Sequence, residues 1–200
     1  GILPRVISGS SAGSLIAGNL ATHTDRELAE QFKPGQFDFD WFRMFGLAEL
    51  VRNEGAADQK LLKKFIASTI IDLTFLEAYK RTGRIVNISI SPTDPHQFPR
   101  LLNYLTSPNV LIRSGVLAST AIPGLFPAVR LRAKNYAGKS VAYMPQSQWM
   151  DGSIVEDIPK DKINRLHNVN HYIVSQTNPH VVPFLGEEIE DTGIFPFIRD

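Results

Sequence analysis

Residues 4–18 read PRVISGSSAGSLIAG, a stretch in which a short apolar run leads into a turn of small residues and then into a segment of helical character. The Gly-x-Ser-x-Gly spacing of residues 9–13 is typical of a strand, a sharp turn and a helix, with the serine exposed on the turn. We expect Ser11 to be a nucleophile. Gly9 and Gly13 would let the strand and the helix approach closely without Cβ clashes.

The composition narrows the classes of protein to consider. The chain has 200 residues, of which 43% are hydrophobic, enough to bury one sizeable core. Its formal net charge of +1 gives no electrostatic argument for binding nucleic acid. Cysteine is absent, which excludes disulfides, cysteine nucleophiles and thiolate metal sites. No apolar run approaches the length needed to cross a bilayer.

We expect one domain over residues 1–200. The chain begins at Gly1, and its expected nucleophile stands already at position 11. A strand that opens a domain so early suggests that upstream sequence has been removed. We therefore interpret the chain as an N-terminally truncated fragment.

Strand patterns alternate with helix patterns, which predicts a layered α/β fold with a largely parallel sheet. Asp58 is a plausible N-cap, and Gly83 is a helix stop. We expect helices over residues 11–22, 25–32, 58–66, 74–82 and 110–121, and strands over residues 6–7, 85–90, 140–144 and 171–176.

An aromatic segment spans residues 37–45, where six large apolar side chains alternate with charged ones. Such a segment packs into a core in most proteins. Aromatic-rich elements also lie well at a lipid–water boundary. The sequence alone leaves both interpretations open.

A serine hydroxyl needs a base within hydrogen-bond reach to act as a nucleophile. One arrangement uses a histidine oriented by Asp151, and the chain order Ser, Asp, His allows His171 or His180. In the other, Asp151 pairs with the serine directly. Asp151 ends an apolar segment, and Gly152 after it permits a tight turn. The residues themselves leave the two arrangements open.

Three blocks, in this order, resemble the patatin-like lipid acyl hydrolases: GSSAGS at residues 9–14, ASTAIPGLFP at 118–127 and DGS at 151–153. Within that family, residues 169–180 resemble the triacylglycerol lipase branch of fungi, plants and some bacteria. The resemblance implies a three-layer α/β fold with a nucleophile elbow and a central, mostly parallel sheet flanked by helices. It also implies a Ser–Asp dyad, with Ser11 as nucleophile and Asp151 as general base, and neither a cofactor nor a metal.

Two departures from the family pattern matter. The family usually has Asp-Gly-Gly or Asp-Gly-Ala where this chain has Asp-Gly-Ser, a variant that the triacylglycerol lipase branch carries. The family's glycine-rich oxyanion loop lies upstream of the elbow, before the point where this chain starts. Ala12 would then supply one oxyanion donor and the missing loop the others. We therefore expect these 200 residues to be nearly inactive alone.

The resemblance favours hydrolysis of long-chain acylglycerols through an acyl-enzyme. Phospholipase A or lysophospholipase activity is the alternative substrate class, and a catalytically silent lipid-surface module is the alternative of another kind. A phosphate-binding turn is disfavoured because Gly-x-x-x-x-Gly-Lys-Ser/Thr is absent. We expect no nucleic-acid partner and an intracellular protein attached peripherally to a membrane or a lipid droplet. The sequence does not indicate an oligomeric state.

Overall fold

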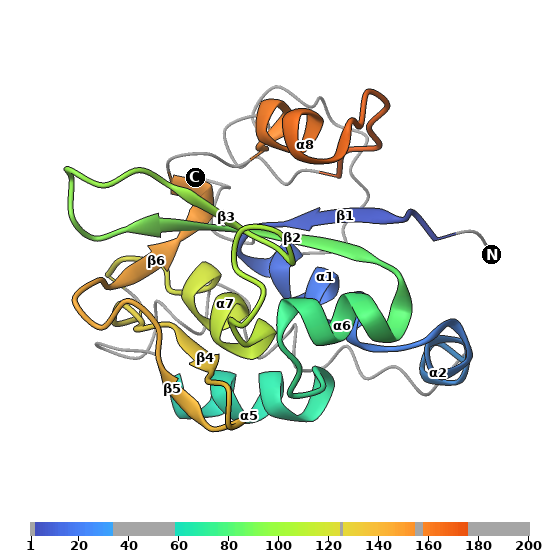
Figure 1. The fold of residues 1–200 in the computed structure, drawn as a ribbon, viewed down its shortest axis with the longest axis horizontal. Helices are drawn as coiled ribbons and strands as arrows, with labels where there is room; N and C mark the ends of the chain where they lie inside the picture. Colours follow the sequence, from blue (N-terminus) through green and yellow to red (C-terminus); the bar gives the residue numbers. More distant parts are fainter. Residues whose placement is uncertain (1–2, 34–58, 125, 155–157, 176–200) are drawn as a thin grey trace, which may run out of the picture.

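The computed structural model describes residues 3–33, 59–124, 126–154 and 158–175. The aromatic segment 37–45, the expected N-cap Asp58 and His180 lie outside these ranges. Figure 1 shows a sheet with most of the helices on one face and a single helix on the other. The predicted α/β class is confirmed.

The central strand is β2 (Ile85–Pro92), which pairs with every other strand of the main sheet. β1 (Val6–Gly9) runs parallel to it, whereas β3 (Arg100–Leu102) and β6 (Trp149–Asp151) run antiparallel. The described sheet is therefore mixed, with one parallel pair. A separate hairpin is formed by β4 (Arg132–Lys134) and β5 (Ser140–Ala142).

The pairing register places β1 and β6 end to end. Gly9 of β1 is the partner of Ile88, and Asp151 of β6 is the partner of Ile90. Both Ile88 and Ile90 also pair with β3, which occupies one edge of β2. β1 and β6 must therefore share the opposite edge. Because they run in opposite directions along it, their carboxyl ends point towards each other.

The helices cover both faces of the sheet. Below it in Figure 1 lie α1, α6 and α7, with α5 beyond them, and α8 lies above. Within the described ranges no helix has the length and apolar character needed to cross a bilayer. The bounds are α1 (Ala12–Thr22), α2 (Asp25–Gln31), α5 (Gln59–Thr69), α6 (Phe75–Thr82), α7 (Ile112–Ser119), the 3₁₀ turn η1 (Gly152–Ile154) and α8 (Lys160–His167).

The two faces of β2 differ in polarity, as its alternating sequence predicts. Ile88 belongs to the main hydrophobic core. It lies on the same face of the sheet as its partner Gly9, which packs against the start of α1. Asn87 points to the other face, where its side-chain oxygen contacts His167 of α8. Every residue of β2 is buried, so α8 shields a polar strand face that the pattern alone would leave to solvent.

Most expected helices are confirmed. The segments predicted over residues 11–22, 25–32, 58–66 and 74–82 correspond to α1, α2, α5 and α6. α6 begins with a capping box between Thr74 and Glu77 and ends at Gly83 in the left-handed conformation. α7 is shorter than predicted, since Val110 and Leu111 form isolated bridges to other segments before the helix starts.

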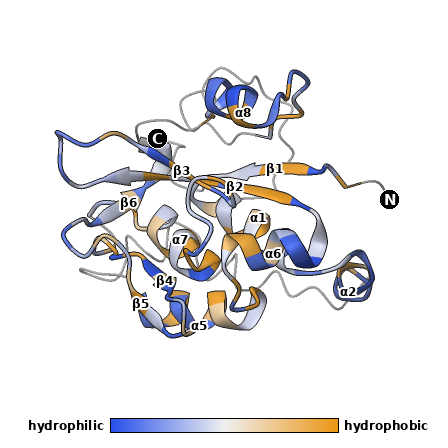
Figure 2. Cartoon of the chain, viewed as in Figure 1, coloured by the Kyte–Doolittle hydropathy of each residue, from blue (hydrophilic) through white to orange (hydrophobic). Residues whose placement is uncertain are grey.

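The prediction of a strand over residues 171–176 is wrong for its described part. Residues 171–175 have no regular structure, and Ile173 is fully exposed. An alternating pattern forms a strand only where a partner strand is available, and in the described ranges none pairs with this segment. The sequence analysis also missed α8, which is mostly hydrophilic (Figure 2) and has only two apolar residues, Ile163 and Leu166.

The contact between α8 and the sheet generates a prediction about pH. Burial lowers the pKa of His167 below its ordinary value, so the folded state favours the neutral ring. The unfolded chain then binds the proton more readily, and stability is lost as the pH falls through about 6.5 towards the lowered folded pKa. We expect the melting temperature of the intact protein to fall over this range and to fall less in His167→Gln.

The matched control is His171→Gln, because His171 is exposed and, among the described residues, bonds only the neighbouring Asn170 side chain. This substitution should leave the pH dependence of melting unchanged. Identical pH profiles for the wild type and His167→Gln would contradict the assignment.

Candidate active site

Ser11 stands on a strained turn between β1 and α1. Its backbone angles are φ 50° and ψ −125°, a region that residues other than glycine rarely adopt. Although Ser11 occupies the N-cap position of α1, its side chain caps no backbone N–H. The hydroxyl is partly exposed and makes no hydrogen bond with any described residue. The predicted strand, sharp turn and helix are therefore present, with the hydroxyl unused by the fold.

The two glycines of the elbow differ in what they do. A Cβ at Gly9 would lie 2.3 Å from the carbonyl oxygen of Gly13, so only glycine lets β1 approach α1 at this point. A Cβ at Gly13 would meet no heavy atom within 4 Å. The close-approach argument holds for Gly9 and is wrong for Gly13, because Gly13 faces open space on α1.

Three serines hold the backbone of Ser11 in place. Its N–H donates to Ser119 Oγ at 3.1 Å, and that hydroxyl donates to the Ser89 carbonyl oxygen at 2.8 Å. The Ser11 carbonyl accepts from Ser14 Oγ at 2.6 Å. Ser119 is completely buried at the end of α7. The strained turn is thus tied to both α7 and β2.

Asp151 is buried, with 2% of its surface exposed, at the end of β6. Its N–H donates to the Ala121 carbonyl at 3.0 Å. Its Oδ1 accepts from the N–H of Ser153 at 2.9 Å and from the hydroxyl of Ser153 at 2.8 Å, which is an Asx turn. Oδ2 makes no hydrogen bond with the described residues, so one carboxylate oxygen is oriented by its partner while the other keeps its lone pairs available.

Gly152 packs directly against the backbone of β2. A Cβ at this position would lie 2.2 Å from the carbonyl oxygen of Ser89, which leaves no room for any other residue. The expected tight turn after Asp151 therefore has a definite steric cause. It is the backbone of β2 that Gly152 approaches.

Ser11 and Asp151 are brought to the same gap in the sheet edge. Gly9 pairs with Ile88 and Asp151 pairs with Ile90, two positions further along β2. At the usual rise of a strand, this register separates the Cα atoms of Gly9 and Asp151 by about 7 Å along the edge. The same register puts the Asp151 side chain on the face where α1 begins. The end of α7 bridges the two, through Ser119 to the elbow and Ala121 to Asp151. No hydrogen bond joins the Ser11 hydroxyl to the Asp151 carboxylate, and such bonds are often long before substrate binds.

The first N–H of α1 belongs to Ala12, which is an exposed residue. It makes no hydrogen bond with any described residue, as is usual for the first donors of a helix. The positive end of the helix dipole adds to its attraction for negative charge. This N–H follows the serine directly, which is where an oxyanion donor is expected.

The histidine alternative gains no support from the described residues. His171 is exposed, and its Nδ1 lies 2.7 Å from the side-chain oxygen of Asn170. It makes no hydrogen bond with Ser11 or Asp151. His180 lies outside the described ranges.

The sequence analysis missed the roles of Ser119 and Ser153. Each lies in a block that was recognised, residues 118–127 and 151–153, but the pattern did not show which member of the block contacts the elbow or the carboxylate. Both contacts depend on the packing of α7 and β6 against β2. A sequence pattern carries no direct signal for that packing.

Comparison with known proteins gives a consistent result. Residues 1–161 match the family described as patatin-like phospholipase. Triacylglycerol lipase SDP1L of Arabidopsis thaliana is 40% identical over 201 residues, covering 92% of this chain and 25% of that protein. Triacylglycerol lipase ptl2 of Schizosaccharomyces pombe is 38% identical over 188 residues, covering 92% and 30%. Triacylglycerol lipase 4 of Saccharomyces cerevisiae is 38% identical over 212 residues, covering 95% and 23%. The chain spans about a quarter of the length of these curated relatives.

The contrast between the two elbow glycines is testable. Gly9→Ala forces a Cβ against backbone atoms, and we expect it to lower the free energy of unfolding by at least about 2 kcal/mol. Gly13→Ala places a better helix former in open space and should leave stability unchanged or raise it by about 0.5–1 kcal/mol. Urea unfolding of the intact protein measures both. Equal losses in the two variants would contradict the steric argument.

A second prediction concerns Ser119. Ser119→Ala removes the acceptor of the Ser11 N–H, and we expect hydrolysis of a soluble chromogenic ester by the intact protein to slow about ten- to a hundredfold, because the nucleophile shifts. Thr120→Ala is the control, since the bonds that the Thr120 hydroxyl makes to described residues all go to carbonyls of α7. Both variants should lose about 1–3 kcal/mol of stability. A similar rate loss in Thr120→Ala would show that Ser119 acts only through stability.

Proposed function

The chain belongs to the patatin-like phospholipase family, and on that premise we propose that it hydrolyses carboxylic esters of long-chain lipids at Ser11, with triacylglycerol as the substrate class. The observation that supports the proposal is the position of β1 and β6 end to end on one edge of β2, because Ser11 follows the end of β1 and Asp151 is the last residue of β6. Relatives named triacylglycerol lipase support the substrate class.

The first half of the proposed reaction acylates Ser11. Asp151 accepts the hydroxyl proton through Oδ2, which bonds no described residue, while Ser11 Oγ attacks the ester carbonyl carbon. The hydrogen bonds from Ser153 to Oδ1 keep the carboxylate in position during the transfer. The tetrahedral intermediate then collapses, the bond to the alcohol oxygen breaks, and Asp151 returns the proton to the leaving alcohol.

The negative charge of the tetrahedral intermediate falls on the former carbonyl oxygen. We assign the Ala12 N–H at the start of α1 as a donor to this oxygen, because Ala12 is an exposed residue and its N–H bonds no described residue. A fixed donor of this kind typically contributes about a hundred- to a thousandfold in rate. The strained backbone of Ser11 sets the angle between this N–H and the nucleophile.

In the second half, water takes the place of the alcohol. Asp151 removes a proton from the water as it attacks the acyl carbon, the same N–H stabilises the charge, and the bond to Ser11 Oγ breaks. Ser11 recovers its proton and the fatty acid leaves.

Phospholipids are the second candidate substrate class, because the family that the chain matches is described as phospholipase. Both classes present a carboxylic ester to the same serine. They differ in the alcohol that leaves, a diacylglycerol or a lysophospholipid. Direct comparison of the two substrates separates them.

An insoluble substrate places the reaction at a lipid–water interface. Phe98 supports such contact at the end of the sheet that carries the site, because it is 86% exposed in the segment that joins β2 to β3. This segment starts directly after the β2 residues that pair with β6. We propose that the protein attaches peripherally to a membrane or a lipid droplet through this end of the sheet.

The assay that tests the proposal compares triolein emulsion with phosphatidylcholine vesicles as substrates for the intact protein. Ser11→Ala should reduce release of fatty acid to background, and Asp151→Asn should reduce it by about a thousandfold or more. The control Asp161→Asn alters an exposed carboxylate on α8 and should leave the rate unchanged.

Each outcome decides between candidates. Faster hydrolysis of triolein supports the proposal, and faster hydrolysis of phosphatidylcholine favours the phospholipase alternative. If the folded, intact protein binds the emulsion but releases no fatty acid, the proposed hydrolase activity is rejected in favour of a lipid-surface module. Full activity in Asp151→Asn would remove Asp151 as the base.

A further inference from the structure

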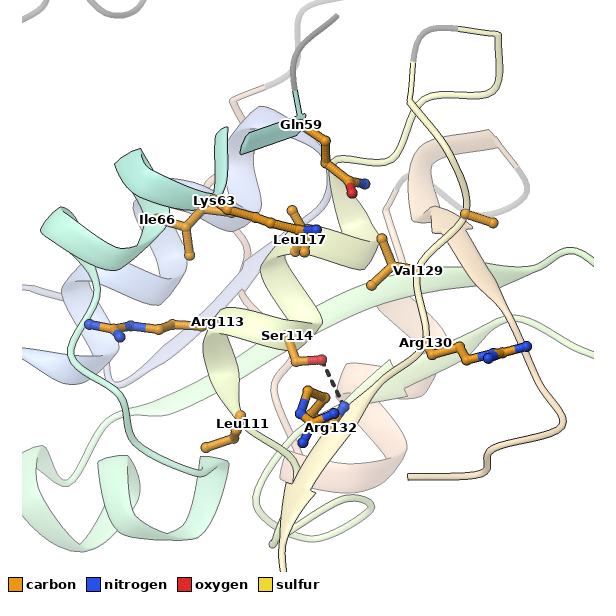
Figure 3. Close-up of a pocket in the computed structure, with 11 residues that line it drawn as sticks. Gln59, Lys63, Ile66, Leu111, Arg113, Ser114, Leu117, Val129, Arg130 and Arg132 are labelled. Atoms are coloured by element: carbon orange, nitrogen blue, oxygen red, sulfur yellow. Dashed lines mark hydrogen bonds between the residues drawn. The ribbon is translucent and has the colours of Figure 1, made fainter. Parts of the chain in front are cut away.

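A cavity of about 360 Å³ opens between α5, α7 and the segment that leads into β4 (Figure 3). This volume lies within the range of about 300–1,000 Å³ that is usual for small-molecule sites. Apolar side chains from all three elements line it. They are Ile66, Leu111, Leu117 and Val129.

The cavity is distinct from the gap between the ends of β1 and β6 where Ser11 and Asp151 lie. Leu117 lines the cavity, whereas Ser119, two residues later on α7, contacts the elbow. Side chains two residues apart point to different sides of a helix. α7 therefore separates the two sites, and neither Ser11 nor Asp151 lines the cavity.

The charged residues that line the cavity are all basic. They are Lys63, Arg113, Arg130 and Arg132, and no aspartate or glutamate lies among the lining residues. None of these four side chains forms a salt bridge with an acidic residue of the described ranges. Uncompensated like charges repel one another, and an anion bound among them lowers that repulsion.

Two of the cations are held in place by the fold. Arg113 donates from Nε to the Ile70 carbonyl at 2.6 Å and from Nη2 to the Ala67 carbonyl at 2.8 Å. Arg132 donates to the hydroxyl of Ser140 at 2.8 Å and to its carbonyl at 2.9 Å. Neither guanidinium pairs with a carboxylate of the described ranges, although Figure 3 shows the Arg113 guanidinium pointing away from Lys63, towards the carbonyls at the end of α5.

Lys63 is the cation best placed to meet a ligand. Its ammonium group makes no hydrogen bond with the described residues, and Figure 3 shows the side chain extending from α5 over the cavity towards α7. Arg130 is likewise unbonded in the described ranges, but in Figure 3 its guanidinium points away from the cavity. A ligand that suits this site has an apolar body and one anionic group.

We propose that the cavity binds the anion of a long-chain fatty acid, with its chain on the apolar floor and its carboxylate against the Lys63 ammonium. The choice of a fatty acid rests on the proposed function, because a fatty acid is the acid that the hydrolysis releases. The site itself is defined by its charge and its apolar floor, independently of Ser11.

The test is isothermal titration of oleate into the intact protein. Lys63→Gln should weaken binding about tenfold, because a charge-assisted contact is lost. Lys64→Gln is the matched control, since Lys64 is the next residue on α5, is exposed and does not line the cavity. Oleyl alcohol should bind more weakly than oleate. Added salt should weaken oleate binding, because the cations are exposed.

The outcomes separate this proposal from the proposed function. Equal oleate affinity in Lys63→Gln and Lys64→Gln, or equal affinity for oleate and oleyl alcohol, would overturn the cavity as a fatty-acid site even if triolein is hydrolysed. Lys63-dependent oleate binding by a protein that hydrolyses no ester would uphold the site and reject the function. Lys63-dependent binding to phosphatidylserine vesicles that oleate does not compete with would assign the cations to a membrane surface instead.

Discussion

The shared edge of β2 is the constraint on which the candidate site depends. β1 and β6 lie on that edge end to end, and the gap between them lies opposite Ser89. Each strand leaves the gap through a glycine that packs on backbone atoms, Gly9 against α1 and Gly152 against Ser89. These two close approaches fix the positions of the elbow and of Asp151 relative to β2.

Partly buried hydrogen bonds offset the backbone strain at Ser11. A residue other than glycine in the left-handed region costs about 1–3 kcal/mol. The Ser119 hydroxyl accepts from the Ser11 N–H and the Ser14 hydroxyl donates to the Ser11 carbonyl, and an intramolecular hydrogen bond typically contributes about 0.5–1.5 kcal/mol. The helix α7 has two structural roles. Its end secures the nucleophile, and its outer side forms a wall of the basic cavity.

The sequence predicted the local features of the site and not its long-range contacts. The elbow, α1 and the capped α6 follow from patterns within a few residues, and they are confirmed. The antiparallel pairing of β6 and the contact of Ser119 with Ser11 join residues far apart in the chain, so local patterns do not contain them. The strand predicted at residues 171–176 failed for the same reason, because it has no partner in the described ranges. Gly13 shows that a motif glycine can lack the steric role its spacing implies.

The most direct measurement of the central claim is covalent labelling of the intact protein with a lipophilic fluorophosphonate, followed by peptide mass spectrometry. The account predicts a single adduct on Ser11 that forms much more slowly in Asp151→Asn. An adduct on another serine, no adduct on a folded protein, or equal labelling rates in the wild type and Asp151→Asn would contradict it.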